Sequence, residues 1–477
     1  MPSINYKFIL KSAFCLTLLF VLNACSFSKI SKNSYNNKKK EFSIRNSALC
    51  NVQKEIYVAY TEPKKAPMVG MSYRGQGLHR EETRSYMRSS DWAEGHKKRY
   101  SKDNGKTWSN WESNENEKQE MGDFTQSGGE SQSGTGPYDP ISNRLIKPVF
   151  QRILQGKPET ALSILWGNKD RLFWDHGFYQ LSDDNGKTWS KAYQLKYEIG
   201  ADFDPNNWVN KDFLFYNEMY IGNAIVLSNG SVIICATVPV PYHDDEDLTY
   251  PSIFPNTYRE NCVAGAICFV GKWNKLRKNY DWMTSNAIFL PRKISSRGLV
   301  ELEISELKNG NLLLIMRGSN AKLNITESPG RKWYSVSKDG GLTWGPVKDL
   351  RYDTGEQFYS SATYHKIIRS SKTGKLYWIG NINTTPANGN YPRYPLQIAE
   401  IDENKPSLKK STVTIIDDRG EGESEFVQLS NFSILENRET KDIEIYLTRL
   451  GENGGGADVW TANSYKYTLS LFTNIKN

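Results

Sequence analysis

Short apolar runs, broken by Gly, Asn or polar turns, recur along this chain of 477 residues. The clearest hairpins are predicted at 224–235 and 306–317, where Asn-Gly separates two apolar runs. The same pattern predicts strands at 55–60, 172–174, 372–378, 444–449 and 467–471. The polar segment 122–138 predicts a long loop instead. No long stretch keeps a helical period, so the pattern predicts an all-β protein.

One motif, Ser-x-Asp-x-Gly-x-x-Trp, occurs three times, at 101–108, 182–189 and 337–344. The Asp of each copy can accept hydrogen bonds from nearby backbone N–H groups, and the Gly suits a positive φ. The Trp can then fold back and pack beneath its own hairpin. We therefore expect each copy to stabilise a β-hairpin tip, and we expect none to contact a substrate.

Successive copies of the motif begin 81 and 155 residues apart, so the second interval is nearly double the first. This spacing predicts repeated four-stranded antiparallel units, some of which have lost the motif. At about 60–70 residues per unit, the chain has room for six or seven units. Radial repetition protects sheet edges, so we predict a six- or seven-bladed β-propeller, with seven blades favoured. The last strand is expected to pair with the first sheet and close the ring.

The N-terminal segment predicts export. Lys7 and Lys11 precede an apolar run at 14–21 that is too short to span a bilayer. Leu22-Asn23-Ala24-Cys25 follows and resembles the lipobox of bacterial lipoproteins, which implies cleavage before Cys25 and lipidation of its thiol. We predict a signal peptide at 1–24, a disordered tether at 25–47 and a catalytic propeller at 48–477. The expected location is the bacterial cell envelope, with the outer membrane favoured, or the medium if the lipobox is not used.

The net charge of +8 shows a mild positive bias. Five lysines of that excess lie at 29–40, in the predicted tether, so the folded domain is less basic than the total suggests. The bias is consistent with an anionic substrate. We expect no nucleic-acid partner, because the chain is predicted to be an exported lipoprotein.

Four cysteines remain after Cys15 and Cys25 are assigned to the signal and the lipid site. An exported protein permits disulfides, and four cysteines allow three pairings, among which the sequence does not choose. Buried free thiols are an equally open alternative. The four residues are Cys50, Cys235, Cys262 and Cys268.

With its three motif copies, the chain resembles the sialidase superfamily of Asp-box propellers over most of 50–475. The segment 301–317 is similar to the part of a sialidase that carries a glutamate, a hairpin and an arginine, which implies functional roles for Glu301 and Arg317. Residues 393–402 resemble a late blade of sialidase-like enzymes. Where sialidases carry Arg-Ile-Pro, this chain has Tyr-Arg-Gly around Arg74, and Asp91 is only a loose match to the acid. This departure puts sialic acid hydrolysis in doubt.

The same propeller also carries polysaccharide lyases, and the chain resembles the ulvan lyases with this fold. That resemblance implies β-elimination on a uronate-containing, sulfated polysaccharide. Arg259 suits the uronate carboxylate, His176 can assist proton transfer, and Tyr242 can act as the base. The predicted substrate-binding residues are Arg74, His96, Glu301 and Arg317.

Each candidate also has a structural interpretation. His176 can anchor a loop, Arg259 can pair with Glu260, and Glu301 can form a buried ion pair with Arg317. Two other functions stay open: a sialidase-like exo-glycoside hydrolase and a non-catalytic glycan-binding lipoprotein. We expect a monomer that requires no cofactor, and the sequence leaves a structural metal ion open.

Overall fold

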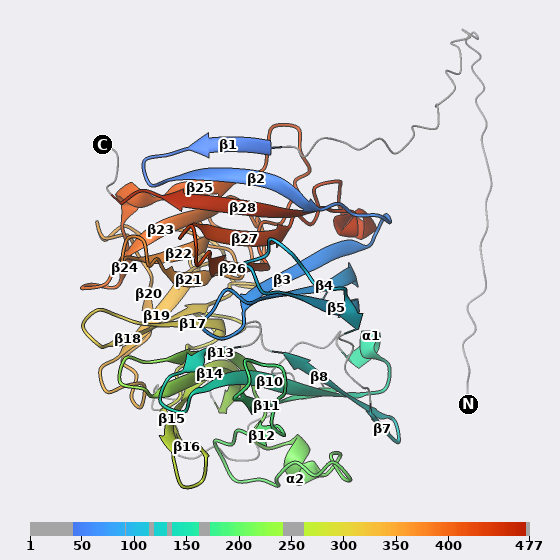
Figure 1. The fold of residues 1–477 in the computed structure, drawn as a ribbon. Helices are drawn as coiled ribbons and strands as arrows, with labels where there is room; N and C mark the ends of the chain where they lie inside the picture. Colours follow the sequence, from blue (N-terminus) through green and yellow to red (C-terminus); the bar gives the residue numbers. More distant parts are fainter. Residues whose placement is uncertain are drawn as a thin grey trace, which may run out of the picture. The chain divides into compact units, whose positions relative to one another are not determined.

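The computed structural model of this protein describes residues 42–90, 92–113, 119–130, 136–161, 172–241 and 262–473. These residues belong to one compact unit that begins at Lys40. Within them the strands form six antiparallel sheets (Figure 1). We number these sheets as blades in chain order. The all-β propeller prediction is confirmed, with six blades in the described residues and not the favoured seven.

The first three blades use the chain up to residue 284. The first blade contains β3 (Ala66–Tyr73), β4 (Arg80–Ser89), β5 (Trp92–Ser101) and β6 (Glu112–Ser113). The second contains β7 (Gln119–Met121), β8 (Phe124–Glu130), β9 (Tyr138–Asp139), β10 (Arg144–Gln155), β11 (Phe173–Ser182) and β12 (Tyr193–Gln194). The third contains β13 (Tyr220–Val226), β14 (Val232–Pro241), β15 (Cys262–Asn274) and β16 (Asn279–Thr284).

The remaining blades use the rest of the chain and its first described strands. The fourth contains β17 (Val300–Glu306), β18 (Leu312–Arg317), β19 (Lys332–Ser337) and β20 (Lys348–Asp349). The fifth contains β21 (Lys366–Arg369), β22 (Leu376–Asn381), β23 (Leu396–Asp402), β24 (Ser407–Leu408) and β25 (Thr414–Asp417). The sixth contains β26 (Phe432–Glu436), β27 (Ile443–Thr448), β28 (Ser464–Leu471), β1 (Phe42–Asn46) and β2 (Cys50–Val58).

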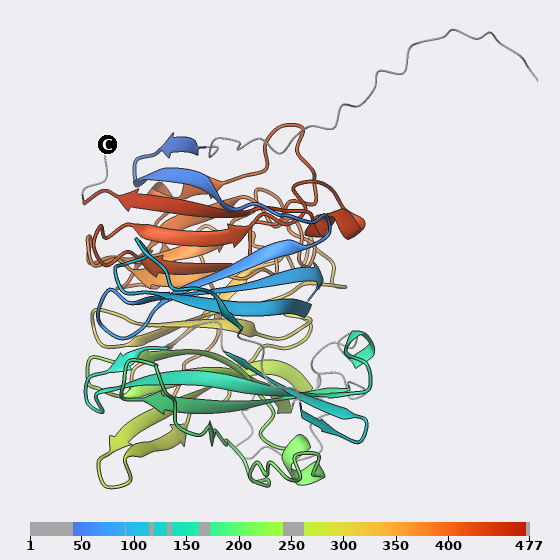
Figure 2. The ribbon, with the colours of Figure 1, turned by 45° about the vertical axis from the view of Figure 1, so that its right-hand side comes forward.

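The sixth blade joins the two ends of the propeller. β2 pairs with β28, with Val52 opposite Leu469, and the two strands lie side by side in both views (Figures 1 and 2). This confirms the predicted ring closure. Both residues are buried in one apolar cluster, so the closure is held by hydrophobic packing as well as by the strand ladder. β1 extends this sheet into residues that the sequence assigned to the tether.

The copies of the repeated motif begin at the last residues of β5, β11 and β19, and all three form the same turn. In the copy at 337–344, Ser337 donates to Asp339 at 2.8 Å and accepts from the Gly341 N–H at 2.9 Å. Thr343 donates to Asp339 from its backbone and its hydroxyl, and the Trp344 indole donates to the Gly341 carbonyl at 3.1 Å. The copies in the first and second blades repeat the serine, aspartate and threonine bonds.

The motif spacing reflects blade order. The copies lie in the first, second and fourth blades, so the doubled interval spans the third blade, which has lost the motif. The Asp side chains stay ionised to low pH, since hydrogen bonds from Thr107 and Ser101 lower the pKa of Asp103 to about 2.

One prediction was wrong: the segment 122–138 is not a loop throughout, because β8 occupies Phe124–Glu130 and pairs with β10. The helices are single turns: α1 (Pro158–Ala161), α2 (Lys211–Leu214), η1 (Lys410–Thr412) and η2 (Gly456–Trp460). In the part of the chain that the structure describes, no helix is long and apolar enough to cross a membrane.

Candidate functional site

The two ends of a blade differ in what they carry. In the fourth blade, Arg317 ends β18 opposite Lys332, whereas Leu312 begins it opposite Ser337 of the repeated motif. Five strand steps separate these ends, which is about 17 Å. We call the Arg317 end the site end and the other the motif end. The motif at 337–344 therefore lies away from the site described below.

At the site end, two neighbouring inner strands are bulged. The β17–β18 register shifts between Val300 and Glu303, and the β13–β14 register shifts between Ile221 and Ala224. Glu301 adopts a φ of 52° within its bulge, a conformation that costs a non-glycine residue about 1–2 kcal/mol. Bulges redirect side chains and are frequent beside active sites. Here the bulge at 300–303 places Glu301 among the residues that line a cavity shared with the third blade.

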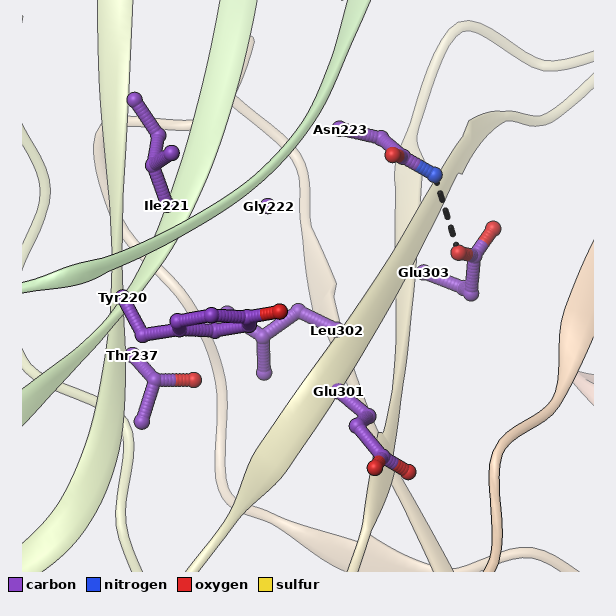
Figure 3. Close-up of a pocket in the computed structure, with 8 residues that line it drawn as sticks. All are labelled: Tyr220, Ile221, Gly222, Asn223, Thr237, Glu301, Leu302 and Glu303. Carbon is purple, nitrogen blue, oxygen red and sulfur yellow. Dashed lines mark hydrogen bonds between the residues drawn. The ribbon is translucent and has the colours of Figure 1, made fainter. Parts of the chain in front are cut away.

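A narrow cavity lies between the two bulges. Figure 3 shows the hydroxyls of Tyr220 and Thr237 pointing toward the side on which Glu301 and Glu303 lie. Asn223 donates to Glu303 across the blade boundary at 2.9 Å (Figure 3). The cavity therefore combines two hydroxyls and two carboxylates, supplied by two blades.

Glu301 belongs to a chain of polar contacts that reaches the fifth blade. Its carboxylate pairs with Arg317, and both side chains are largely buried, with 20% and 12% exposed. Arg317 donates to the Asn390 side chain at 3.2 Å, and Arg393 donates to the Asn390 carbonyl at 3.2 Å. Within the described residues, Glu301 Oε2 and Arg317 Nε are buried without a hydrogen-bond partner. Buried polar atoms are normally satisfied, so an unsatisfied acceptor and an unsatisfied donor in one ion pair distinguish this group from an ordinary structural ion pair.

Lys332 adds a third cation beneath this group. Its side chain is fully buried, and its amine donates to the carbonyls of Ser361, at 3.2 Å, and Thr363. The pKa of Lys332 is lowered to about 7, chiefly by burial; Glu301 opposes the shift, and Arg317 and Arg393 add to it. Lys332 therefore titrates near neutral pH, and its charge depends on what anion is close.

A second ion pair lies near this group. Lys366 pairs with Glu303 at 2.5 Å, and both side chains are 7% exposed. Burial raises the pKa of Glu303, although Lys366 opposes the shift. Because this pair is neutral overall, it leaves the charge balance of Glu301 and the three cations unchanged.

The structure brings together two of the predicted substrate-binding residues, Glu301 and Arg317, and places the other two elsewhere. Arg74 follows β3 at the motif end, where it donates to the Gly186 carbonyl and lies over the Tyr100 ring at 4.3 Å. It joins the first and second blades, so we do not retain it in the site. His96 is exposed on β5, with Nε2 3.1 Å from the Ala93 carbonyl.

Of the predicted catalytic residues, His176 alone is described. Its side chain is fully buried in β11 and stacks on Phe213, with ring centroids 4.1 Å apart. It forms an isolated bridge with Glu218, two residues before Tyr220 of the cavity. The other predicted residues that lie outside the described part of the chain are Tyr242, Arg259, Asp91 and Cys25.

Sequence reasoning did not assign Lys332, Arg393 or Tyr220 to the site. One available signal was Gly222, a lone glycine within an apolar strand, which is typical of a bulge or a close backbone approach. Lys332 carried no such signal, because a lysine at the start of a strand is ordinary, and only the fold shows that this one is buried.

Comparisons with known proteins define the class to which this chain belongs. The model of the BNR/Asp-box repeat matches residues 99–110 and 180–191. The third copy, at 337–344, has the same serine, aspartate and threonine bonds. No curated protein matches the chain in sequence.

Solved structures share the fold at low identity. A protein of unknown function from Dyadobacter fermentans has a TM-score of 0.53 and 13% identity, covering 88% of this chain and 99% of that one. The NanB sialidase of Streptococcus pneumoniae has a TM-score of 0.53 and 12% identity, covering 88% and 70%. A Hadza microbial sialidase has a TM-score of 0.50 and 13% identity, covering 86% and 66%. The chain is thus a β-propeller with BNR/Asp-box repeats and a sialidase-type fold, and glycan-processing enzymes are among its fold neighbours.

Proposed function

We propose that this protein is a carbohydrate-active enzyme that binds a carboxylated sugar at the site end of the propeller. One observation carries the proposal: three cations, Arg317, Lys332 and Arg393, share this end with the carboxylate of Glu301, which pairs with Arg317. Like charges this close repel in a partly buried setting, and an anionic ligand relieves the excess. The sialidases among the fold neighbours support a glycan as that ligand, by analogy of fold.

The arginines are suited to the carboxylate of the sugar. Arg317 is held by Glu301 and Asn390, and Arg393 by Asn390, so both guanidinium groups are oriented before a ligand arrives. A guanidinium offers paired donors that match carboxylate geometry. Preorganised donors contribute more than mobile ones, because no ordering is required on binding.

Hydrolysis of the glycosidic bond is the chemistry that the described residues support best. Glu301 and Tyr220 line the same cavity (Figure 3). Hydrolysis would use the Tyr220 oxygen as the nucleophile at the anomeric carbon and Glu301 as the base that takes its proton, which requires the Glu301 side chain to turn toward the phenol. The alternative of a glycan-binding lipoprotein without activity uses the same cations but no such pair.

β-Elimination on an acidic polysaccharide such as ulvan is the second candidate. It is favoured by the position of β14 and β15, because Pro241 and Cys262 face each other at the site end and flank the segment with Tyr242 and Arg259. His176 lies at the boundary of the second and third blades, where it bridges to Glu218. In this reaction the arginines would neutralise the uronate carboxylate, and Tyr242 would remove the C5 proton.

The products separate these functions. The full chain is incubated with a sialylated oligosaccharide and, separately, with ulvan. Release of a free acidic monosaccharide without ultraviolet absorbance supports hydrolysis, whereas growth of absorbance from an unsaturated uronate supports elimination. Binding of either glycan without any product favours the binding lipoprotein. Failure of both glycans to bind would overturn the proposal.

We also propose that the protein is exported and held by a lipid on Cys25, as a monomer. The lipobox-like sequence supports this. Cys25→Ala should abolish labelling by a radioactive fatty acid and release the protein from the membrane fraction. Labelling that survives this substitution would contradict the anchor.

A further inference from the structure

Two cysteines of the third blade stand directly opposite each other. Cys235 of β14 and Cys268 of β15 are register partners, and their sulfur atoms are 3.0 Å apart. Both side chains are fully buried in one apolar cluster with Ile233, Ala266 and Val270. Two sulfurs this close in a dry environment are either a thiol pair or the two halves of a disulfide.

The backbone hydrogen bonds of Cys268 show whether Cys235 and Cys268 are a hydrogen-bonded or a non-hydrogen-bonded pair of the antiparallel ladder. Its N–H donates to the Ser285 hydroxyl at 2.9 Å, and its carbonyl accepts from the Ser285 N–H at 2.9 Å. Both groups therefore point toward the β16 side and away from β14. Cys235 and Cys268 are thus a non-hydrogen-bonded pair, in which Cα atoms of facing residues are about 4.5 Å apart. That spacing lies within the range that disulfides span.

We propose that Cys235 and Cys268 form a cross-strand disulfide in the exported protein. The two thiols lose two protons and two electrons, and a bond forms between their sulfur atoms. The electrons reduce the disulfide bond of an oxidant, either a small-molecule disulfide or an oxidoreductase, which leaves as two thiols. The cell envelope is an oxidising compartment that supplies such an oxidant.

The reaction belongs to folding and not to the finished protein. Neither sulfur is accessible once the blade has packed, and burial raises the pKa of Cys235 well above its ordinary value. The thiolate that attacks a disulfide is then scarce. The pair must exchange while β14 and β15 are still open, and the bond is afterwards shielded from reductants.

The other cysteines do not compete for this pair. Cys262 lies six residues from Cys268 along β15, which is about 20 Å in a strand. Cys50 is buried in a different apolar cluster, in the sixth blade. The fold therefore selects the single bond Cys235–Cys268 and leaves Cys50 and Cys262 as thiols.

The position of the bond suggests its effect. The two cysteines are 33 residues apart in sequence. They lie opposite each other on β14 and β15, the paired strands between which residues 242–261 connect. The Cys235 carbonyl also lies against Gly222, so close that a Cβ there would be 3.0 Å from it. The bond would thus fix the sheet directly behind one bulge of the cavity. A loop of this length predicts a rise in melting temperature of about 4 °C for a domain of this size.

The test compares the full chain refolded with oxidised and reduced glutathione against the chain refolded with reductant alone. Each sample is denatured with an alkylating reagent and mapped by peptide mass spectrometry. In the oxidised sample we expect a linked peptide pair containing Cys235 and Cys268, with Cys50 and Cys262 alkylated. Alkylation of Cys235 and Cys268 in that sample, or a link to another cysteine, would overturn the proposal. This readout needs no variant.

Variants add a second measurement. The oxidised wild-type chain should melt about 4 °C above the reduced chain, and Cys50→Ala should keep that difference. The double variant Cys235→Ala/Cys268→Ala should melt at one temperature under both conditions. A redox-dependent melting temperature in the double variant, or none in the wild type, would contradict the bond.

Discussion

Arg317 and Arg393 lie 76 residues apart in the chain and meet on a single residue. The side-chain oxygen of Asn390 accepts from Arg317, and its main-chain oxygen accepts from Arg393, each at 3.2 Å. One asparagine therefore sets the separation of two guanidinium groups from different blades. This arrangement makes the cation group rigid, and several consequences can be measured.

Arg317→Met should weaken binding of a carboxylated sugar at least tenfold, because a charge-assisted hydrogen bond contributes about 1.5–3 kcal/mol. The measurement is the dissociation constant by calorimetry. Arg74→Met is the matched control, since Arg74 joins two blades at the motif end. It should lower the melting temperature and leave affinity unchanged. Equal losses of affinity in both variants would contradict the assignment of the site end.

Binding should depend on pH through Lys332. Its pKa is about 7 in the folded protein, so the amine loses its charge as pH rises through that value. Affinity for an anionic sugar should fall by about fivefold between pH 6 and pH 8, as expected if the ligand raises that pKa by about one unit. Lys332→Met should flatten the profile in this interval. If the affinity of Lys332→Met still falls between pH 6 and pH 8, the titrating group is not Lys332.

The same group predicts a stability profile. The folded pKa of Lys332 lies below the unfolded value of about 10.4, so the unfolded chain binds more protons between pH 7 and pH 10. The contribution of Lys332 to stability is therefore present above the unfolded pKa and is lost as pH falls toward 7. Denaturant unfolding of the wild type and Lys332→Met across this interval measures the difference.

The positive φ of Glu301 is expected to lower the stability of the protein, whereas its carboxylate is expected to be required for activity. Glycine adopts a φ of 52° without strain, so Glu301→Gly should be about 1 kcal/mol more stable than Glu301→Ala. Both variants should lose glycan processing, because both lack the carboxylate. Urea unfolding measures the stability of the two variants, and product release measures their activity. Equal stability of the two variants would show that the bulge relaxes without cost.

The repeated motif should affect stability alone. Trp344 is 5% exposed and packs in the apolar cluster between the third and fourth blades, so Trp344→Ala should cost about 3–5 kcal/mol. Its KM for a glycan substrate should match the wild type. A raised KM with an unchanged melting temperature would place this motif at the substrate.

The sequence predicted the parts of the fold that depend on local chemistry. The Asn-Gly turn at 229–230 joins β13 to β14, and the three motif copies form the hairpins that their Asp, Gly and Trp residues favour. It missed β8, because that strand is poor in apolar residues and pairs only with β10 and β7 of its own sheet. The structure has one blade fewer than the favoured seven, because connections such as 195–219, between β12 and β13, take more chain than an average unit allows.

The sequence by itself determined the hairpins, the repeat and the class of fold, because these follow from turn chemistry and spacing within a few residues. The sequence could also predict Glu301 and Arg317 as neighbours, since both lie on one hairpin. The tertiary structure alone decided that Lys332 and Arg393 join them, that Arg74 does not, and that Cys235 faces Cys268. Those relationships depend on which blades meet and on how strands register, and a local pattern carries neither piece of information.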